Sequence, residues 1–71
     1  MKNSQITPII EAEANKHINE YLIKGFSEIE SLRMSLDKIK LLKKNSPLIA
    51  VHWELEKALI VKIANYESRN K

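Results

Sequence analysis

One segment of this 71-residue sequence, from Ser46 to about Tyr66, is apolar around more than half of a helical circumference. One line at helical spacing has the pattern of a core-facing stripe and contains Leu48, Leu55, Leu59, Ile63 and Tyr66. A second line on the adjoining face contains Ile49, Trp53 and Ile60. A helix with such a wide apolar surface either lies at the centre of a bundle or is shared with another chain. The pattern therefore favours protein–protein association.

The composition favours a single helical domain without covalent or metal cross-links. One glycine, two prolines and 44% hydrophobic residues differ strongly from a disordered or β-rich chain. A chain of this length forms one domain, which we expect to span residues 1–71, and buries only about 60% of the surface that it exposes when unfolded. The absence of cysteine excludes disulfides and thiolate metal sites. Oligomerisation is then the remaining common way to stabilise so small a core.

Neither a secretory signal nor a membrane-spanning segment is expected. The N-terminal residues lead into no continuous apolar stretch, and the longest apolar segment is interrupted by Glu54, Glu56, Lys57 and Lys62. We therefore expect a soluble, cytoplasmic protein that does not contact a membrane.

The net charge of +3 is unevenly distributed along the chain. Residues 1–36 have four Lys/Arg against five Asp/Glu, whereas residues 37–71 have eight against four. The second half therefore attracts acidic surfaces mildly, but it lacks the dense basic stripe of a dedicated nucleic-acid binder.

Local signals mark where the helices begin and end. Thr7-Pro8 and Ser46-Pro47 each combine an N-cap hydroxyl with a proline at the first helical position. Ser27 with Glu30 three positions later is a capping-box pattern. Gly25 ends or bends the first helix, and the sequence leaves open whether it makes a corner or a kink.

These signals predict helices at about residues 8–24, 28–44 and 47–66, followed by a polar tail at residues 67–71. Short connections favour antiparallel neighbours, so the last two helices should form a hairpin. The expected fold class is all-α: a small three-helix bundle, or an antiparallel helical hairpin with an additional N-terminal helix, in a protein that is oligomeric.

Both histidines have a carboxylate four residues away, but the spacing is not that of a metal site. Glu13 precedes His17, and Glu56 follows His52. The di-metal bundle pattern is Glu-x-x-His, with a spacing of three, so no metal ligands are predicted. Both histidines lie within apolar stripes, and we interpret them as half-buried structural residues. The alternative is a pH-sensitive assembly, since burial disfavours the charged imidazole.

The lysines at positions 38, 40, 43 and 44 are the only group that invites a nucleic-acid interpretation. Lys40, Lys43 and Lys44 are the candidate phosphate contacts, while Lys38 points to another side of the helix. No arginine or exposed aromatic residue is interleaved for base recognition or stacking. We therefore interpret the group as charge that stabilises a helix end and promotes solubility.

Nothing in the sequence predicts catalysis. No serine stands in an evident relationship to a histidine and a carboxylate, and a single glycine cannot make a glycine-rich phosphate loop. We expect no catalytic residue, no cofactor and no enzymatic activity.

Residues 26–66 resemble the helical hairpins of bacterial type III secretion, in which needle subunits and their small co-chaperones are chains of similar length. The residues that carry the resemblance are Ser35-Leu36-Asp37-Lys38-Ile39 and Asn45-Ser46-Pro47-Leu48-Ile49. The chain has Ala58-Leu59-Ile60 where needle subunits have a Tyr-Asn pair, and it lacks their second turn proline, so the resemblance is to the co-chaperone type. It implies binding to another helical protein through Trp53, Leu55, Leu59 and Ile60.

We therefore predict a small protein–protein interaction module, acting as an adaptor, co-chaperone or regulator. The expected partner is a second copy in a homodimer or a heterologous helical protein. The candidate partner-binding residues are Ile49, Trp53, Leu55, Leu59 and Ile60. The alternative is a small dimeric regulator that binds nucleic acid through the basic second half.

Overall fold

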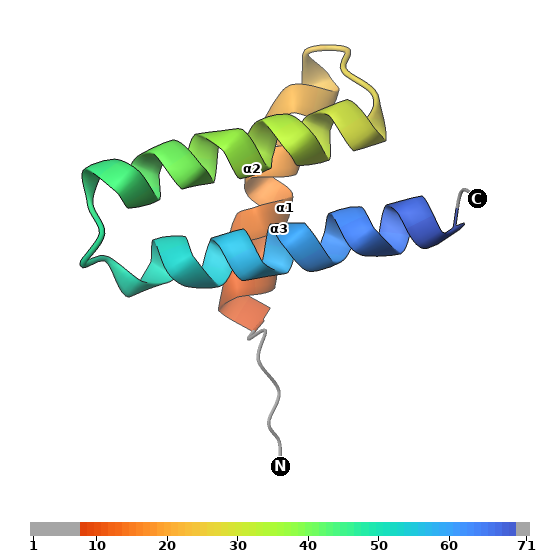
Figure 1. The fold of residues 1–71 in the computed structure, drawn as a ribbon. Helices are drawn as coiled ribbons and strands as arrows, with labels where there is room; N and C mark the ends of the chain where they lie inside the picture. The colour runs from red at the N-terminus through yellow and green to blue at the C-terminus, as the bar shows by residue number, and fades with distance from the viewer. Residues whose placement is uncertain (1–7, 70–71) are drawn as a thin grey trace.

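A computed structural model describes residues 8–69 as three α-helices. These are α1 (Pro8–Ile23), α2 (Glu28–Asn45) and α3 (Ala50–Arg69). Helices α2 and α3 run antiparallel as a hairpin, and α1 crosses both of them steeply on one side (Figure 1). The predicted all-α fold is confirmed. Within residues 8–69, no helix is long and apolar enough to cross a membrane.

Gly25 makes a true corner between α1 and α2. Its φ of +102° is one that a residue with a side chain rarely adopts. Two hydrogen bonds close the end of α1: the Phe26 amide donates to the Tyr21 carbonyl at 3.2 Å, and the Gly25 amide donates to the Leu22 carbonyl at 3.0 Å. This pair is the Schellman motif, and the accompanying apolar contact is the edge-to-face packing of Tyr21 on Phe26.

The predicted capping box opens α2. The Ser27 hydroxyl accepts a hydrogen bond from the Glu30 amide at 3.2 Å, and the Glu30 carboxylate accepts one from the Ser27 amide at 3.1 Å. Both amides would otherwise lack a partner at the start of the helix. The predicted N-cap of the first helix, Thr7, lies outside the described residues, and α1 begins at Pro8.

The predicted bounds of the third helix are wrong at both ends. The Ile49 amide donates to the Ser46 carbonyl at 3.2 Å, which makes residues 46–49 a turn with Pro47 at its second position. Helix α3 therefore begins at Ala50 rather than at Pro47, and it continues to Arg69 through part of the predicted polar tail. Proline fits the second position of a turn as well as the first position of a helix, so the local signal did not separate the two.

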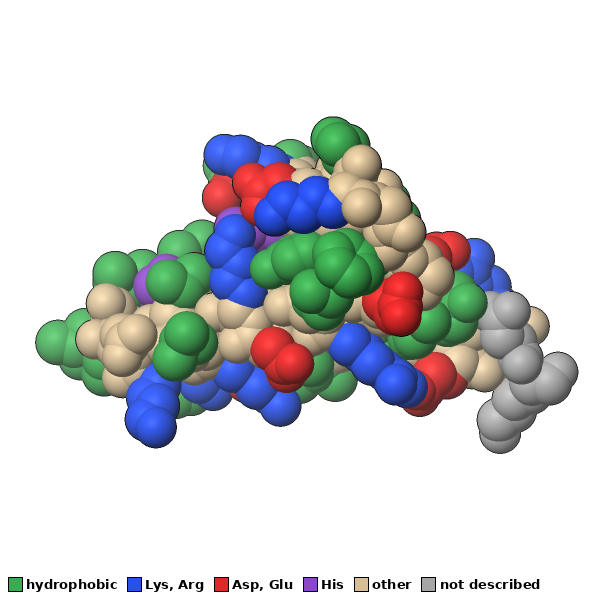
Figure 2. All heavy atoms as spheres, turned by 90° about the horizontal axis from the view of Figure 1, so that it is seen from above, with side chains coloured by type: hydrophobic (Ala, Val, Ile, Leu, Met, Phe, Trp, Pro, Cys, Tyr) green, Lys and Arg blue, Asp and Glu red, His purple; other side chains and the backbone are tan. Residues whose placement is uncertain are grey.

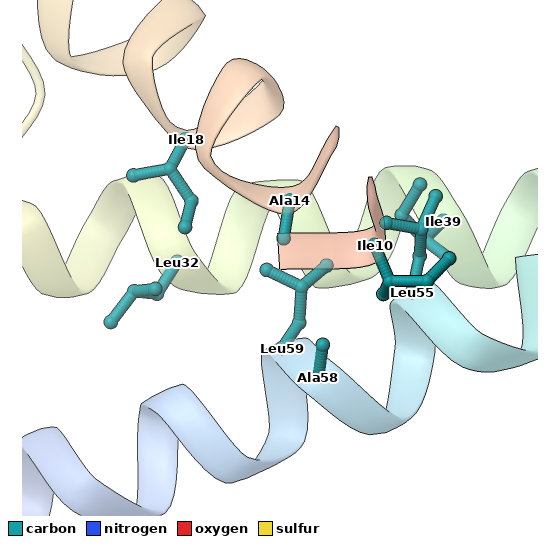
Figure 3. Packing of buried hydrophobic residues seen from close by; sticks show 8 residues of the cluster. All are labelled: Ile10, Ala14, Ile18, Leu32, Ile39, Leu55, Ala58 and Leu59. Atoms are coloured by element: carbon teal, nitrogen blue, oxygen red, sulfur yellow. The ribbon is translucent and has the colours of Figure 1, made fainter. Parts of the chain in front are cut away.

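The core forms where α1 crosses the hairpin (Figure 3). Helix α1 contributes one residue per turn, and these residues pack on apolar side chains of both other helices. The buried apolar residues are Ile10, Ala14, Ile18, Leu32, Ile39, Leu55, Ala58 and Leu59. Two serines of α2, Ser31 and Ser35, are also fully buried, and their hydroxyls have no hydrogen-bond partner among the described residues. The alanines and serines are small, and they allow the crossing helices to approach closely.

Candidate interaction surface

Two ion pairs show which sides of the hairpin face α1. Lys38 of α2 forms an ion pair with Glu20 at 3.2 Å, and Lys62 of α3 forms one with Glu11 at 2.6 Å. Both carboxylates belong to α1. A residue two positions away on a helix lies about 200° around its axis. Residues two positions from these lysines therefore lie on the side of the hairpin that is turned away from α1.

We call this side the open face, and it consists of Lys40, Trp53, Lys57, Ile60 and Ala64, with the partly buried Leu36 and, at its loop end, Ile49. Figure 1 shows that α1 passes behind both hairpin helices and leaves this face uncovered. Three of its large apolar side chains are about half exposed: Ile49 at 46%, Trp53 at 47% and Ile60 at 49%. Seen edge-on from the α2 side, apolar groups alternate with charged ones on the surface (Figure 2).

Two of the predicted partner-binding residues are not on this face. Leu55 and Leu59 are buried in the core and contact α1 and α2 rather than solvent. Their assignment as contact residues of a partner is therefore corrected: they hold the protein's own helices together. Leu48 was predicted to be the first residue of the core stripe, and this prediction is also wrong. Leu48 lies in the turn before α3 and is 97% exposed.

Trp53 is held in a fixed position at the loop end of the open face. Its indole Nε1 donates a hydrogen bond to the Pro47 carbonyl at 2.8 Å. The ammonium group of Lys43 lies 4.2 Å from the ring centre, in a cation–π arrangement. The same ammonium donates to the Glu56 carboxylate at 2.5 Å. The turn, α2 and α3 are thus joined at one aromatic ring, which remains half exposed.

These contacts also involve one of the three lysines that were predicted to bind nucleic acid. Lys43 is partly buried and engaged by Glu56 and Trp53, so its charge is compensated within the chain. Lys40 and Lys44 remain exposed. Two exposed lysines are fewer than the several phosphate contacts that non-specific binding requires.

His17 lies on α1 close to charged groups of both α1 and α2. Burial lowers the pKa of His17 below 6.5, and the positive charge of Lys38 lowers it further, against the opposing influence of Glu20 and Glu13. Its Nδ1 is buried and, like that of His52, has no hydrogen-bond partner among residues 8–69. No three histidine or carboxylate side chains in the same part of the chain are grouped so that they could bind a metal ion.

The lowered pKa of His17 predicts a loss of stability in mild acid. The unfolded chain binds a proton at His17 near pH 6.5, whereas the folded chain binds it only at lower pH. Stability is therefore complete above the unfolded pKa and falls as the pH drops below it. We expect chemical denaturation at about pH 7.5 and about pH 5.5 to give a lower unfolding free energy in acid.

The matched variants are His17→Gln and His52→Gln. Replacing His17 should reduce the pH dependence over this interval, and an unchanged dependence would contradict the assignment. The Glu20 carboxyl does not interfere, because its hydrogen bond to Lys38 lowers its pKa below 4.5, outside the interval.

A cleft of about 600 Å³ lies on the covered side of the hairpin, where all three helices meet. Its floor is apolar, with Ile18 and Leu32, and its walls include the amides Asn15, Asn19 and Asn65. Neither histidine lines it. No local sequence pattern predicts this cleft, because the residues that line it come from three separate helices.

Comparisons of the chain with models of known protein families, with curated proteins and with solved structures gave no match. The class therefore rests on the fold and the surface: a small all-α protein whose residues 8–69 form three helices. Its hairpin carries a half-exposed apolar face on the side that α1 does not cover.

Proposed function

We propose that this protein is a small helical interaction module that binds another protein chain through its open face. One observation carries the proposal: the core is complete without Ile49, Trp53 and Ile60, which remain half exposed on the side turned away from α1. Large apolar side chains gathered on one side of a monomer are typical of a protein-binding surface. Burial of that surface would contribute roughly 25 cal/mol per Å² of apolar area.

The position of Trp53 supports the proposal further. Tryptophan is enriched among the residues that contribute most to binding energy at interfaces. The ring of Trp53 is already held by Pro47 and Lys43, so little side-chain freedom remains to be lost on association. A side chain ordered before binding contributes more net affinity than one that must be ordered by the partner.

Binding of nucleic acid is the less favoured function, because Lys43 is neutralised by Glu56 and only Lys40 and Lys44 of the predicted group stay exposed. The resemblance to type III secretion co-chaperones stays a prediction. It agrees with the proposal in Trp53 and Ile60, but not in Leu55 and Leu59, which are buried.

The test is photo-cross-linking from neighbouring positions of α3 in cells that produce the protein. A benzophenone side chain replaces either Ile60 on the open face or Val61. Val61 is nearly as exposed, at 46% against 49%, but lies about 100° around the helix. We expect a covalent adduct with a second protein chain from position 60 and much less from position 61. An Ile60→Glu substitution should abolish an adduct formed through a benzophenone at Ala64 without loss of helicity by circular dichroism. No adduct from position 60, or equal adducts from both positions, would overturn the proposal.

A further inference from the structure

We propose that the cleft on the covered side of the hairpin binds an extended peptide segment of another protein, through main-chain hydrogen bonds to the side-chain amides of Asn15 and Asn19. This site is separate from the open face, and the inference does not rest on the proposed function. Three features of the cleft carry it: the spacing of its amides, its apolar floor and the pairing of its charges.

Amide side chains of two helices converge on this cleft. Asn15 and Asn19 belong to α1, and Asn65 belongs to α3. None of these three side chains has a hydrogen-bond partner among residues 8–69. A primary amide presents donors and an acceptor side by side, so each can bond both the carbonyl and the N–H of one peptide residue.

The spacing of the two α1 amides matches that of an extended chain. Asn15 and Asn19 are one helical turn apart, which is about 6 Å along the axis of α1. In an extended chain, alternate residues direct their main-chain groups to the same edge, and they are about 6.7 Å apart. Two such residues can therefore bond to Asn15 and Asn19 in turn. A helical segment would not use these amides, because its main-chain groups already bond one another.

A segment that follows α1 also crosses both helices of the hairpin. The ion pairs place Glu11 of α1 beside α3 and Glu20 beside α2, so α1 leads from one hairpin helix to the other (Figure 1). From Asn15 to Leu22, the part of α1 that lines the cleft is about 10 Å long. This is the length of about three extended residues.

The floor of the cleft favours apolar side chains. Ile18 and Leu32 line it, and Leu22 of α1 adds a side chain that is 40% exposed. Every second side chain of an extended segment points to the same face, so one set contacts the floor and the other faces solvent. Main-chain hydrogen bonds then provide affinity and the floor provides selectivity. We therefore expect apolar residues at alternate positions of the bound segment.

The charges that line the cleft are compensated within the chain. Lys62 pairs with Glu11 at 2.6 Å, and Arg69 pairs with Glu28 at 3.6 Å. A phosphate or carboxylate ligand would have to compete with these carboxylates for the two cations. The paired charges therefore favour a ligand recognised through uncharged main-chain groups.

The test selects binders from a phage-displayed library of short linear peptides on the immobilised full-length chain, and titrates fluorescein-labelled binders by fluorescence anisotropy. We expect binders with alternating apolar residues, and at least about tenfold weaker binding to the variant N15A/N19A. Two control variants should bind as the natural chain does: Lys16→Ala, on the outer side of α1, and Ile60→Glu, on the open face. Circular dichroism should show equal helicity, because Asn15, Asn19 and Lys16 are exposed and alanine favours a helix.

The decisive result is a match between individual amides and individual peptide residues. Methylation of one main-chain nitrogen in the peptide removes one N–H donor. One such methylation should weaken binding to the natural chain but lose its effect in Asn15→Ala. Methylation two residues away should lose its effect in Asn19→Ala instead. A library without binders, or methylation effects that are unchanged in both variants, would overturn the inference.

The failure of this inference differs from the failure of the proposed function. Peptides whose binding depends on Ile60, and not on Asn15 and Asn19, occupy the open face. They would remove the peptide site in the cleft and leave the proposed function intact. Absence of an adduct from position 60, together with peptides that depend on Asn15 and Asn19, would remove the proposed function and leave the cleft site.

Discussion

Replacing Leu59 by alanine should leave most of the protein unfolded at room temperature. Leu59 is fully buried where α1 crosses the hairpin, close to Ala14 and Ala58 (Figure 3). Truncation of a buried leucine costs about 2–5 kcal/mol, because the apolar contacts are lost and the cavity closes only in part. A single core of this size rarely supplies more than about 3–5 kcal/mol in total. Thermal unfolding followed by far-ultraviolet circular dichroism measures the loss.

The adjacent Ile60 provides the matched control. The substitution Ile60→Ala removes a side chain of similar size from the same turn of α3, but from the half-exposed open face. Ile60→Ala should therefore change the unfolding free energy of the monomer by less than about 1 kcal/mol. Equal destabilisation by the two substitutions at a concentration where the protein is monomeric would contradict the division of α3 into a core side and an open side.

Enlarging Ala14 to leucine should displace α1 from the hairpin. Ala14 is fully buried and points toward Leu59 at the crossing of the helices. Additional carbon atoms in such a closely packed position force the backbones apart and cost about 1–3 kcal/mol, sometimes more. We expect a lower midpoint of urea unfolding, together with faster proteolysis within α1.

Ala12→Leu is the control for this second substitution. Ala12 is exposed on the same helix, and leucine is nearly as good a helix former as alanine. This variant should therefore unfold within about 0.5 kcal/mol of the natural chain. If Ala12→Leu destabilised the protein as much as Ala14→Leu, the close crossing of α1 would not be the cause.

The elements that follow from short-range chemistry could be predicted from the sequence. The capping box of Ser27 and Glu30 involves residues three positions apart. Gly25 was predicted to end or bend the first helix, and only the structure shows that it makes a corner. The start of α3 was missed because Pro47 fits two local conformations equally well. The hydrogen bond from Trp53 to the Pro47 carbonyl stabilises the turn, and nothing in the Ser46-Pro47 dipeptide signals it.

The candidate site was predicted only in part, because contacts between helices decide which of its residues are buried. The width of the apolar arc on α3 can be read from spacing, but which part of it faces the core depends on the direction from which α1 and α2 approach. Leu55 and Leu59 were therefore grouped with Trp53 and Ile60, although the structure buries the first two. Lys43 was grouped with its basic neighbours, because its contacts with Trp53 and Glu56 cross from one helix to the next.

The steep crossing of α1 has a consequence for the order in which the chain assembles. The pair of Lys43 and Glu56 closes a loop between residues 13 positions apart, whereas that of Glu11 and Lys62 spans 51 positions. Chain entropy makes the longer closure costlier by about 1 kcal/mol. We therefore expect the hairpin to form before α1 packs on α3, and the contact of α1 with α3 to be the first to open. Such local opening would expose Ala58 and Leu59, a second apolar surface on the opposite side of the hairpin from Trp53 and Ile60.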